Sequence, residues 1–408
     1  MELLKHELYK IFSKKGLYIS LLVMSMVVFL PMILPLVNQV NRDFGSTKEL
    51  QSYSKPYEGN VNNYKDVTAE LLNKLQMYKG KDTIKSNIYN FIIGEYSFQG
   101  KPRMAAISDI MKKTKNTFVD KIGRINGGVH DFEAYELKDL DNNIKLLEIQ
   151  DKVNTYEYKN KVLASNMYNK VSTPNVYYNE GWWRVIWIMS SLSPFLIVTM
   201  LLLGVSPTFA GEYESKVAPI LLSTKNGRVK IMKTKILAAI IYTITVVSVV
   251  NLVGLTVIMF VFGIGGWNAP MQCLSDYICS PYNFTIIQFW LVAMLTSIVG
   301  YIIFTGVIIL ISNISKSSLT TFFLTAFVFS LPIIIEKLVV TSGSWTKVIL
   351  NLSINQFMKG TKIYEVLYTV NVLGKPIIYP LFELGYGVVI IILLYFMIKN
   401  SITKKYSI

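Results

Sequence analysis

Six long apolar stretches constrain this chain more than any other feature of its sequence. A transmembrane helix needs about 20 predominantly apolar residues, because the hydrocarbon layer of a bilayer is about 30 Å thick. We therefore predict an all-α membrane protein with six transmembrane helices, of which the fifth is the shortest. The stretches are Leu17 to Val37, Trp183 to Val205, Ile236 to Ile264, Phe284 to Ile311, Leu319 to Ile335 and Ile377 to Ile398.

Composition and charge agree with a membrane protein. Of the 408 residues, 52% are hydrophobic and only 16% are charged, whereas soluble domains carry about 25% charged residues. The net charge is +15, and in a membrane protein an excess of Lys and Arg sets orientation and attracts anionic lipid. We expect membrane lipids as partners and no nucleic acid. The first apolar stretch is longer than a signal-peptide core and no small-residue cleavage site follows it, so we expect it to remain in the mature protein.

The distribution of Lys and Arg predicts the orientation. Basic residues gather in the N-terminal segment, in the loop after the second apolar stretch and in the C-terminal tail, whereas residues 265–283 contain none. With six crossings the three basic segments lie on one side, which the positive-inside rule makes the cytoplasm. The sequence thus predicts a multi-pass protein of the plasma membrane with both termini in the cytoplasm.

The chain divides into four parts. Residues 1–16 are expected to form a cytoplasmic amphipathic helix at the membrane interface, along the inner leaflet, because Leu4, Leu8, Ile11 and Phe12 share one face. Residues 17–37 form the first transmembrane helix, and Pro31 and Pro35 predict a kink or an early end within it. Residues 38–181 form a polar extracytoplasmic domain, and residues 182–408 hold transmembrane helices two to six. The outer domain is predicted to be mainly helical, because apolar residues recur at helical spacing at Val67, Leu71, Leu75 and Tyr78 and at Leu146, Ile149 and Val153.

The cytoplasmic loop 211–235 carries more pattern than a simple connection needs. Two acidic residues, Glu212 and Glu214, are expected to open a short helix that must bury Val217, Ile220, Leu221 and Leu222. An Asn226-Gly227 turn then returns the chain to the membrane. Such a helix could act as a rigid lever on the second and third transmembrane helices. The alternative is that the two acids only balance nearby Lys residues at the membrane surface.

This loop resembles that of type-2 ATP-binding-cassette (ABC) exporter permeases, which reads Glu-x-Glu-x-Gly-Thr-x-x-x-Leu-Leu-Ser-x-Pro-x-x-Arg-x-x-(Ile/Leu)-x-x-Gly-Lys. The chain departs from this pattern at Lys216 and Val217, which replace the Gly-Thr pair, at Lys225, which replaces Pro, and at Thr234, which replaces Gly. Two further features fit the same family: the amphipathic N-terminal helix, which resembles the elbow helix of these permeases, and the six predicted transmembrane helices. The residues in register are Glu212, Glu214, Leu221, Leu222, Ser223, Arg228, Ile231 and Lys235.

The resemblance implies a permease subunit that pairs with a second copy or a homologous permease and binds two cytoplasmic ABC ATPase subunits. ATP would be bound and hydrolysed by those partners, which agrees with the lack of a Gly-x-x-x-x-Gly-Lys-(Ser/Thr) loop in this chain. The cargo class implied is hydrophobic or amphipathic, such as a lipid, peptide or drug. The residues expected to contact the ATPase are Glu212, Glu214, Val217, Ile220, Leu221, Leu222, Ser223 and Arg228.

The sequence offers little chemistry of its own. Its two His residues, His6 and His130, fall on opposite sides of the membrane in this topology, so we expect no catalytic site, metal site or cofactor, and no enzyme activity in this chain. Cys273 and Cys279 lie in one outer loop and could form a disulfide or remain thiols. Within the apolar stretches, Glu383 could face a polar path or, as we favour, reach outside water, and Asn251 is expected to bond across helices.

Two other functions stay open. The chain could be a transporter or channel that needs no ATPase, although such proteins usually show inverted repeats and ionisable residues at the membrane midplane. It could also be a surface receptor or immunity protein whose domain 38–181 binds a ligand while the helices serve as an anchor.

Overall fold

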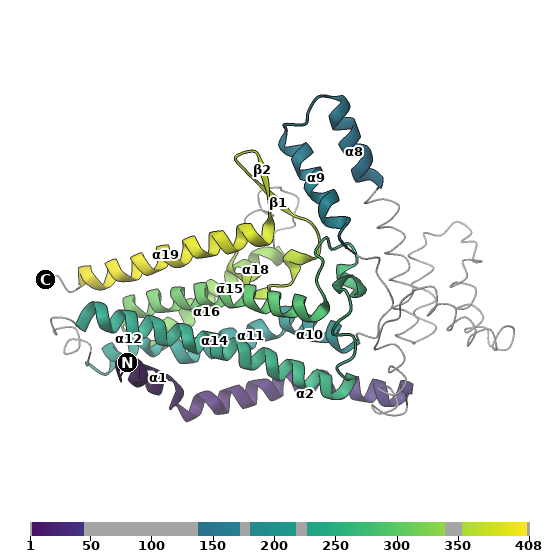
Figure 1. Cartoon of the computed structure of the whole chain (residues 1–408). Coiled ribbons are helices and arrows are strands. Elements are labelled where there is room, and N and C mark those ends of the chain that lie inside the picture. The colour runs from purple at the N-terminus through teal and green to yellow at the C-terminus, as the bar shows by residue number, and fades with distance from the viewer. Residues whose placement is uncertain (1, 45–137, 172–179, 218–226, 339–352, 406–408) are drawn as a thin grey trace.

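The computed structural model describes residues 2–44, 138–171, 180–217, 227–338 and 353–405. These parts are mostly helical, and the long helices run side by side as a bundle (Figure 1). The N- and C-terminal ends of the chain lie at one end of the bundle, and helices α8 (Lys138–Ile149) and α9 (Tyr156–Tyr168) project from the other end.

Five segments among the described residues are long and apolar enough to cross a membrane. Together they confirm a multi-pass, predominantly helical architecture, as the sequence predicts. They are Ser193–Glu214, Val229–Phe262, Ile286–Ile314, Ser318–Ile335 and Tyr379–Thr403. The helices that contain them are α11 (Ser193–Val205) with α12 (Pro207–Glu214), α14 (Gly227–Phe262), α15 (Ile286–Ile314), α16 (Ser318–Leu338) and α19 (Tyr379–Lys405).

Helix α2 (Lys15–Phe44) covers the first predicted transmembrane helix. It continues through Pro31 and Pro35, so of the two predicted outcomes the early end is excluded and the kink stays a prediction. Its apolar part with fully described side chains, Lys15–Met26, is shorter than a membrane span. A sixth crossing by α2 therefore stays a prediction.

The second predicted transmembrane helix is not continuous, contrary to expectation. Helix α10 (Glu180–Ser191) ends before Leu192, and α11 begins at Ser193 with a proline in its first turn. A second proline begins α12 after Ser206. Proline has no backbone N–H and fits the first turn of a helix, so each of the two prolines starts a new helix. Apolar composition alone suggests one continuous helix here.

The core of the bundle lies where α11 crosses α14. Leu196, Met200 and Leu201 of α11 are fully buried. A Cβ atom at Gly204 would overlap the ring of Tyr242 on α14, and the Tyr242 hydroxyl donates to the carbonyl of Met200 at 2.8 Å. The glycine thus leaves room for the Tyr242 ring where the two helices cross.

A short β-hairpin precedes the last helix and departs from a purely helical fold. Strand β1 (Thr369–Val372) pairs antiparallel with β2 (Lys375–Ile378). Leu373 and Gly374 both have positive φ in the turn, at 52° and 78°, which matches the twist of a two-residue hairpin. The hairpin follows α18 (Ile354–Lys359) and the 3-10 turn η5 (Lys362–Tyr364).

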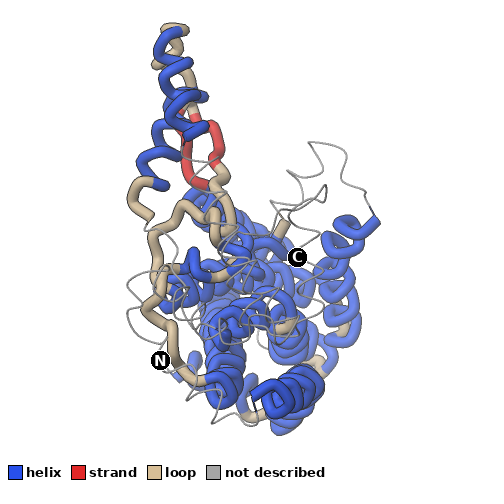
Figure 2. Tube along the Cα trace, turned by 90° about the vertical axis from the view of Figure 1, so that its right-hand side faces the viewer, coloured by secondary structure: helices blue, strands red, loops and turns tan. Residues whose placement is uncertain are grey.

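The outer helices α8 and α9 rest on this hairpin. Seen from their end of the bundle, they stand directly above the strands (Figure 2). Thr369 Oγ1 donates to Asn160 Oδ1 at 2.8 Å and lies 2.9 Å from the Tyr156 hydroxyl oxygen. Leu140, Ala164 and Tyr168 form a small apolar cluster between the two helices.

The helical prediction for this outer part is confirmed for Lys138–Ile149, but its apolar face is different. Leu146 and Ile149 are exposed, and Val153 lies beyond the end of α8, whereas Leu140 and Leu147 are buried. Residues 45–137, including the predicted helix through Val67 to Tyr78, lie outside the described residues. The boundaries of an extracytoplasmic domain stay a prediction.

Candidate functional site

The best-connected polar site lies at the end of the bundle that holds both termini. Here α1 (Glu2–Phe12), α12 and the beginning of α14 gather (Figure 1). We call this group of residues the inner junction: Glu7, Lys10, Thr208, Glu212, Glu214, Lys235, Ser312 and Ser318. It contains the first part of the loop for which the sequence predicts a function.

The first turn of α12 is held by a residue of another helix. The backbone N–H groups of Phe209 and Ala210 both donate to Ser312 Oγ of α15 at 3.1 Å, and Ser312 Oγ donates to the carbonyl of Ser206 at 2.7 Å. The first N–H groups of any helix lack partners within that helix. Ser312 of α15 supplies the missing partners for α12. These hydrogen bonds join α12 to α15 at the point where α11 ends.

Lys235 of α14 is the centre of the inner junction. Its side chain is 1% exposed, and Nζ donates to Glu212 Oε1 and to the carbonyl of Thr208, each at 2.6 Å. Glu7 Oε2 of α1 lies 3.6 Å away, and the Phe209 ring lies 5.0 Å below the ammonium group. A buried ammonium is tolerated only when it is paired and hydrogen-bonded, and here α1 and α12 provide the partners.

Helix α1 packs on the inner junction with the face that the sequence predicts. Ile11 is buried, and Leu4, Leu8 and Phe12 pack against the same core. The Phe12 ring meets Tyr242 edge-on at 5.5 Å. The amphipathic prediction is therefore confirmed for Glu2–Phe12.

The sequence analysis missed Glu7, which lies on the buried side of α1. It accepts a hydrogen bond from Lys10 Nζ at 3.2 Å, and Lys10 Nζ also lies 3.5 Å from Glu212 Oε1. Burial opposes the charge of Lys10, but the carboxylates of Glu7 and Glu212 outweigh it and raise the Lys10 pKa. A signal existed: Glu7 precedes Ile11 by four residues, so an acid stands on the apolar face.

Glu214 connects the end of α12 to α16. Its Oε1 accepts from the backbone N–H of Ser318 at 3.0 Å, and its Oε2 accepts from Ser318 Oγ at 2.7 Å. Ser318 is the first residue of α16. A carboxylate at a helix N-terminus is stabilised by free N–H groups and by the helix dipole, so this contact caps α16.

The two acids of the predicted coupling motif therefore close a helix and do not open one. Helix α12 begins at Pro207 and ends at Glu214, Ser215 follows as its C-cap, and Lys216 has a positive φ of 58°. The predicted start at Glu212 was wrong because Pro207 is itself a start signal. Val217 is exposed at the edge of a 350 Å³ cleft that Glu7, Glu212 and Lys235 also line.

The middle of the motif lies outside the described residues. This applies to Ile220, Leu221, Leu222 and Ser223, and to the side chain of Arg228. Their predicted contact with an ATPase stays a prediction. The structure shows how the loop that carries them begins at α12 and how it ends in α14 at Lys235.

Both polar residues predicted within the membrane behave differently from expectation. The amide of Asn251 donates to the carbonyl of Val247 at 2.9 Å, four residues earlier in α14. It therefore bonds within its own helix, and the predicted bond to another helix is wrong. Glu383 of α19 is 1% exposed, so the preferred interpretation that it reaches outside water is wrong. The packing of α19 against its neighbours buries it, which a single helix pattern does not reveal.

The segment between α14 and α15 holds the two cysteines. Cys273 is buried in the 3-10 turn η3 (Met271–Cys273), and Cys279 is half-buried with its carbonyl accepting from the Tyr168 hydroxyl at 3.3 Å. A disulfide between them stays a prediction. Across the described residues, His, Cys, Asp and Glu side chains do not gather in any group that could hold a metal ion.

Comparison with protein-family models, curated proteins and solved structures finds no match to this chain. Its function must therefore be argued from its residues and their contacts.

Proposed function

We propose that this protein is the membrane subunit of an ATP-driven exporter of the ABC type. The observation that carries the proposal is the inner junction, in which one short helix, α12, is bound to four other helices through polar contacts. Lys235 joins it to α14, Lys10 to α1, Ser312 to α15 and Ser318 to α16. A mechanical coupling element needs this kind of attachment.

The strength of these contacts supports a rigid connection. Removing one partner of a buried ion pair costs about 3–5 kcal/mol, so α12 cannot separate from Lys235 without a large penalty. Packed interfaces respond to a push by shifting as units. A force on residues 218–226 would thus reach α14 and α16 together, where a loosely attached loop would absorb it.

The arrangement of the chain ends supports the proposed topology. If α2 crosses the membrane together with the five described spans, the number of crossings is even and both termini lie on the same side. Figure 1 shows both ends of the chain at the end of the bundle where the inner junction lies. With the basic residues of that end in the cytoplasm, residues 218–226 would meet a cytoplasmic ATPase.

The proposed complex has two such ATPase subunits and a second permease, either another copy of this chain or a homologous one. The sequence has no phosphate-binding loop, so the ATPase subunits would supply the energy. The cargo would be hydrophobic or amphipathic and would leave the plasma membrane toward the outside.

Copurification from native membranes tests the proposal. We expect an ATPase of the ABC type to copurify with the tagged wild-type protein but not with the double variant Leu221→Asp/Leu222→Asp. The control is Leu373→Asp at the hairpin tip, where the side chain is 98% exposed and far along the chain from the loop. An ATPase that stays bound to the double variant, or none with the wild type, would contradict the proposal.

A transporter without an ATPase is the second candidate, and one observation favours it. Glu383 is a buried ionisable residue within a membrane-spanning helix, and such residues often mark transport paths. Export from sealed vesicles that contain only this protein, driven by an ion gradient and without ATP, would support this candidate over the first.

A further inference from the structure

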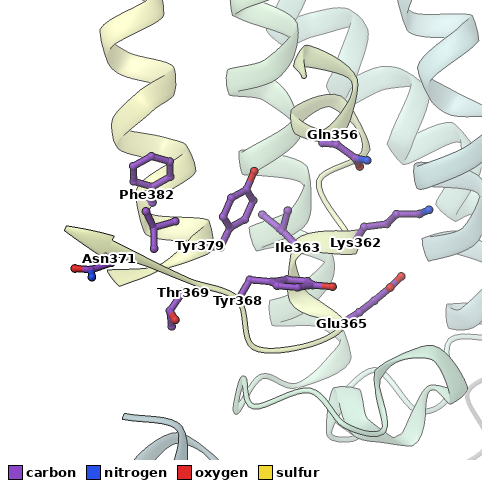
Figure 3. Close-up of a pocket in the computed structure, with 10 residues that line it drawn as sticks. Gln356, Lys362, Ile363, Glu365, Tyr368, Thr369, Asn371, Tyr379 and Phe382 are labelled. Carbon is purple, nitrogen blue, oxygen red and sulfur yellow. The ribbon is translucent and has the colours of Figure 1, made fainter. Parts of the chain in front are cut away.

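A cleft of about 590 Å³ opens beside the N-terminal end of α19. The aromatic rings of Tyr368, Tyr379 and Phe382 border it, and Lys362 and Glu365 extend along its other side (Figure 3). Its volume is typical of sites for small molecules, which combine an apolar lining with a few polar groups. We call it the outer cleft.

Glu383 lies one helical turn below the outer cleft. It follows Tyr379 by four residues, so the two side chains share a face of α19 and lie about 6 Å apart along its axis. Side chains in a helix incline toward its N-terminus, which for Glu383 is the direction of the cleft. Its carboxyl group is close enough to interact electrostatically with the hydroxyls of both Tyr379 and Tyr364.

The other side of this carboxyl group is closed by packing. One turn further along α19, a Cβ at Gly387 would lie 3.1 Å from Val299 of α15 and 3.2 Å from Phe357 of α18. Both carboxyl oxygens of Glu383 are buried, and neither has a hydrogen-bond partner among the described residues. A buried carboxyl without a donor or cation is costly in its charged form, so the neutral acid is favoured unless a cation pairs with it.

We propose that the outer cleft binds an amphipathic ammonium compound, whose cationic group pairs with Glu383. Three observations point to this ligand class. The aromatic rings offer both an apolar surface and faces that attract cations. The carboxyl group that lacks a partner supplies the opposite charge, and the cleft has room for an apolar body. This inference rests on the cleft alone and holds for either function considered above.

Pairing with an ammonium group has a measurable proton balance. The neutral acid releases its proton to solvent as it becomes a carboxylate paired with the R–NH₃⁺ ligand, which keeps its own three protons. Among the described residues, the titratable groups that line the cleft are Lys362, Glu365, Tyr368 and Tyr379, and Tyr364 also interacts with Glu383. Replacing each carboxyl by an amide shows which of them is the source of the proton.

The test uses the full-length protein in lipid nanodiscs and three probes with the same apolar body: 4-phenylbutylammonium, 4-phenylbutanol and 4-phenylbutyrate. Isothermal titration calorimetry at neutral pH, repeated in buffers of different ionisation enthalpy, gives both affinity and protons released. We expect the ammonium to bind at least tenfold more tightly than the alcohol and to release protons. Glu383→Gln should abolish both the preference and the release.

Glu365→Gln is the matched control, because Glu365 borders the same cleft and is only half-buried. It should keep the preference for ammonium and the proton release. If both variants lose the preference for ammonium equally, the negative charge at the edge of the cleft attracts the cation without direct pairing to Glu383. This result would overturn the proposal. Equal affinity of wild type for all three probes would overturn it as well. Unchanged thermal unfolding of Glu383→Gln shows that any loss is not a folding defect.

Discussion

Lys235 and Glu212 form an ion pair of 2.6 Å in which the ammonium group is almost completely buried. The two residues belong to α14 and α12, and they are 23 positions apart with residues 218–226 between them. The loop that carries the predicted coupling residues is thus closed at its base by a buried charge pair. If the loop couples to an ATPase as proposed, a force on it would enter the bundle through this contact.

Replacing Lys235 with Met should destabilise the protein by about 3–5 kcal/mol, because Glu212 and Glu7 lose the cation that balances them. Thermal unfolding in detergent measures the loss. Lys230→Met is the control, since Lys230 is exposed on the same helix. The double variant Lys235→Met/Glu212→Gln should recover part of the stability. If Lys235→Met and Lys230→Met unfold at the same temperature, the pair does not hold α12 in place.

Glu214→Ala should weaken the start of α16 by about 1 kcal/mol, the usual cost of losing a helix cap. Ser318→Ala removes the same side-chain contact from the other side. Because both changes break one interaction, a double-mutant cycle in unfolding free energy should give a coupling of about 0.5 kcal/mol or more. Additive effects would show that α12 and α16 are not joined here.

Glu214→Ala should also lower cargo export more than it lowers ATPase copurification. Glu214 is one of the predicted ATPase contacts, but its side chain is already bonded to Ser318 at the start of α16 within this chain. Transport by reconstituted complexes, normalised to bound ATPase, measures the difference. A proportional loss of both quantities would place Glu214 in the binding surface itself.

Cysteine labelling checks the topology. In a background with Cys273→Ser and Cys279→Ser, we expect Leu373→Cys to react with a membrane-impermeant maleimide from outside intact cells. Lys225→Cys should react only after the membrane is opened, because positively charged loops stay in the cytoplasm. Reaction of Lys225→Cys in intact cells would place the loop outside and remove the basis for coupling to an ATPase.

Gly204→Val should destabilise the bundle by about 1–3 kcal/mol, the typical cost of overpacking, because any side chain there overlaps the Tyr242 ring. Gly385→Ala is the matched glycine control, since a Cβ at that position of α19 meets no atom within 4 Å. It should be neutral or slightly stabilising, because alanine loses less chain entropy in a helix. Midpoints of thermal unfolding compare the two.

Because of Glu365, the stability of the protein should depend on pH. Burial, opposed by nearby Lys362, raises the pKa of this carboxyl above its usual 4.5. Between 4.5 and the raised value, the folded protein holds more protons than the unfolded chain, so stability falls as pH rises through this window. Unfolding temperatures from pH 4 to pH 8 should show this fall in wild type and a smaller one in Glu365→Gln. Parallel curves would contradict the assignment.

The sequence predicts the membrane helices well because the free energy of placing an apolar stretch in a bilayer depends on local composition. Four of the six stretches form continuous helices long enough to cross, and the second overlaps a fifth candidate span, Ser193–Glu214, that lies further along the chain. The same holds for α1, whose apolar face follows from residues three and four apart. Periodicity was less informative in α8, where apolar residues occur on two sides and the register alone cannot show that Leu140 and Leu147 are the buried ones.

The sequence by itself determined that this chain is a multi-pass helical protein with an amphipathic N-terminal helix, since hydrophobicity and charge act within one segment. Only the tertiary structure decided that Glu7 meets Lys235, that Glu214 caps α16 and that Glu383 is enclosed. These outcomes depend on which helices pack together over long distances in the chain. A buried charge or carboxyl acquires its role from neighbours that no local pattern specifies.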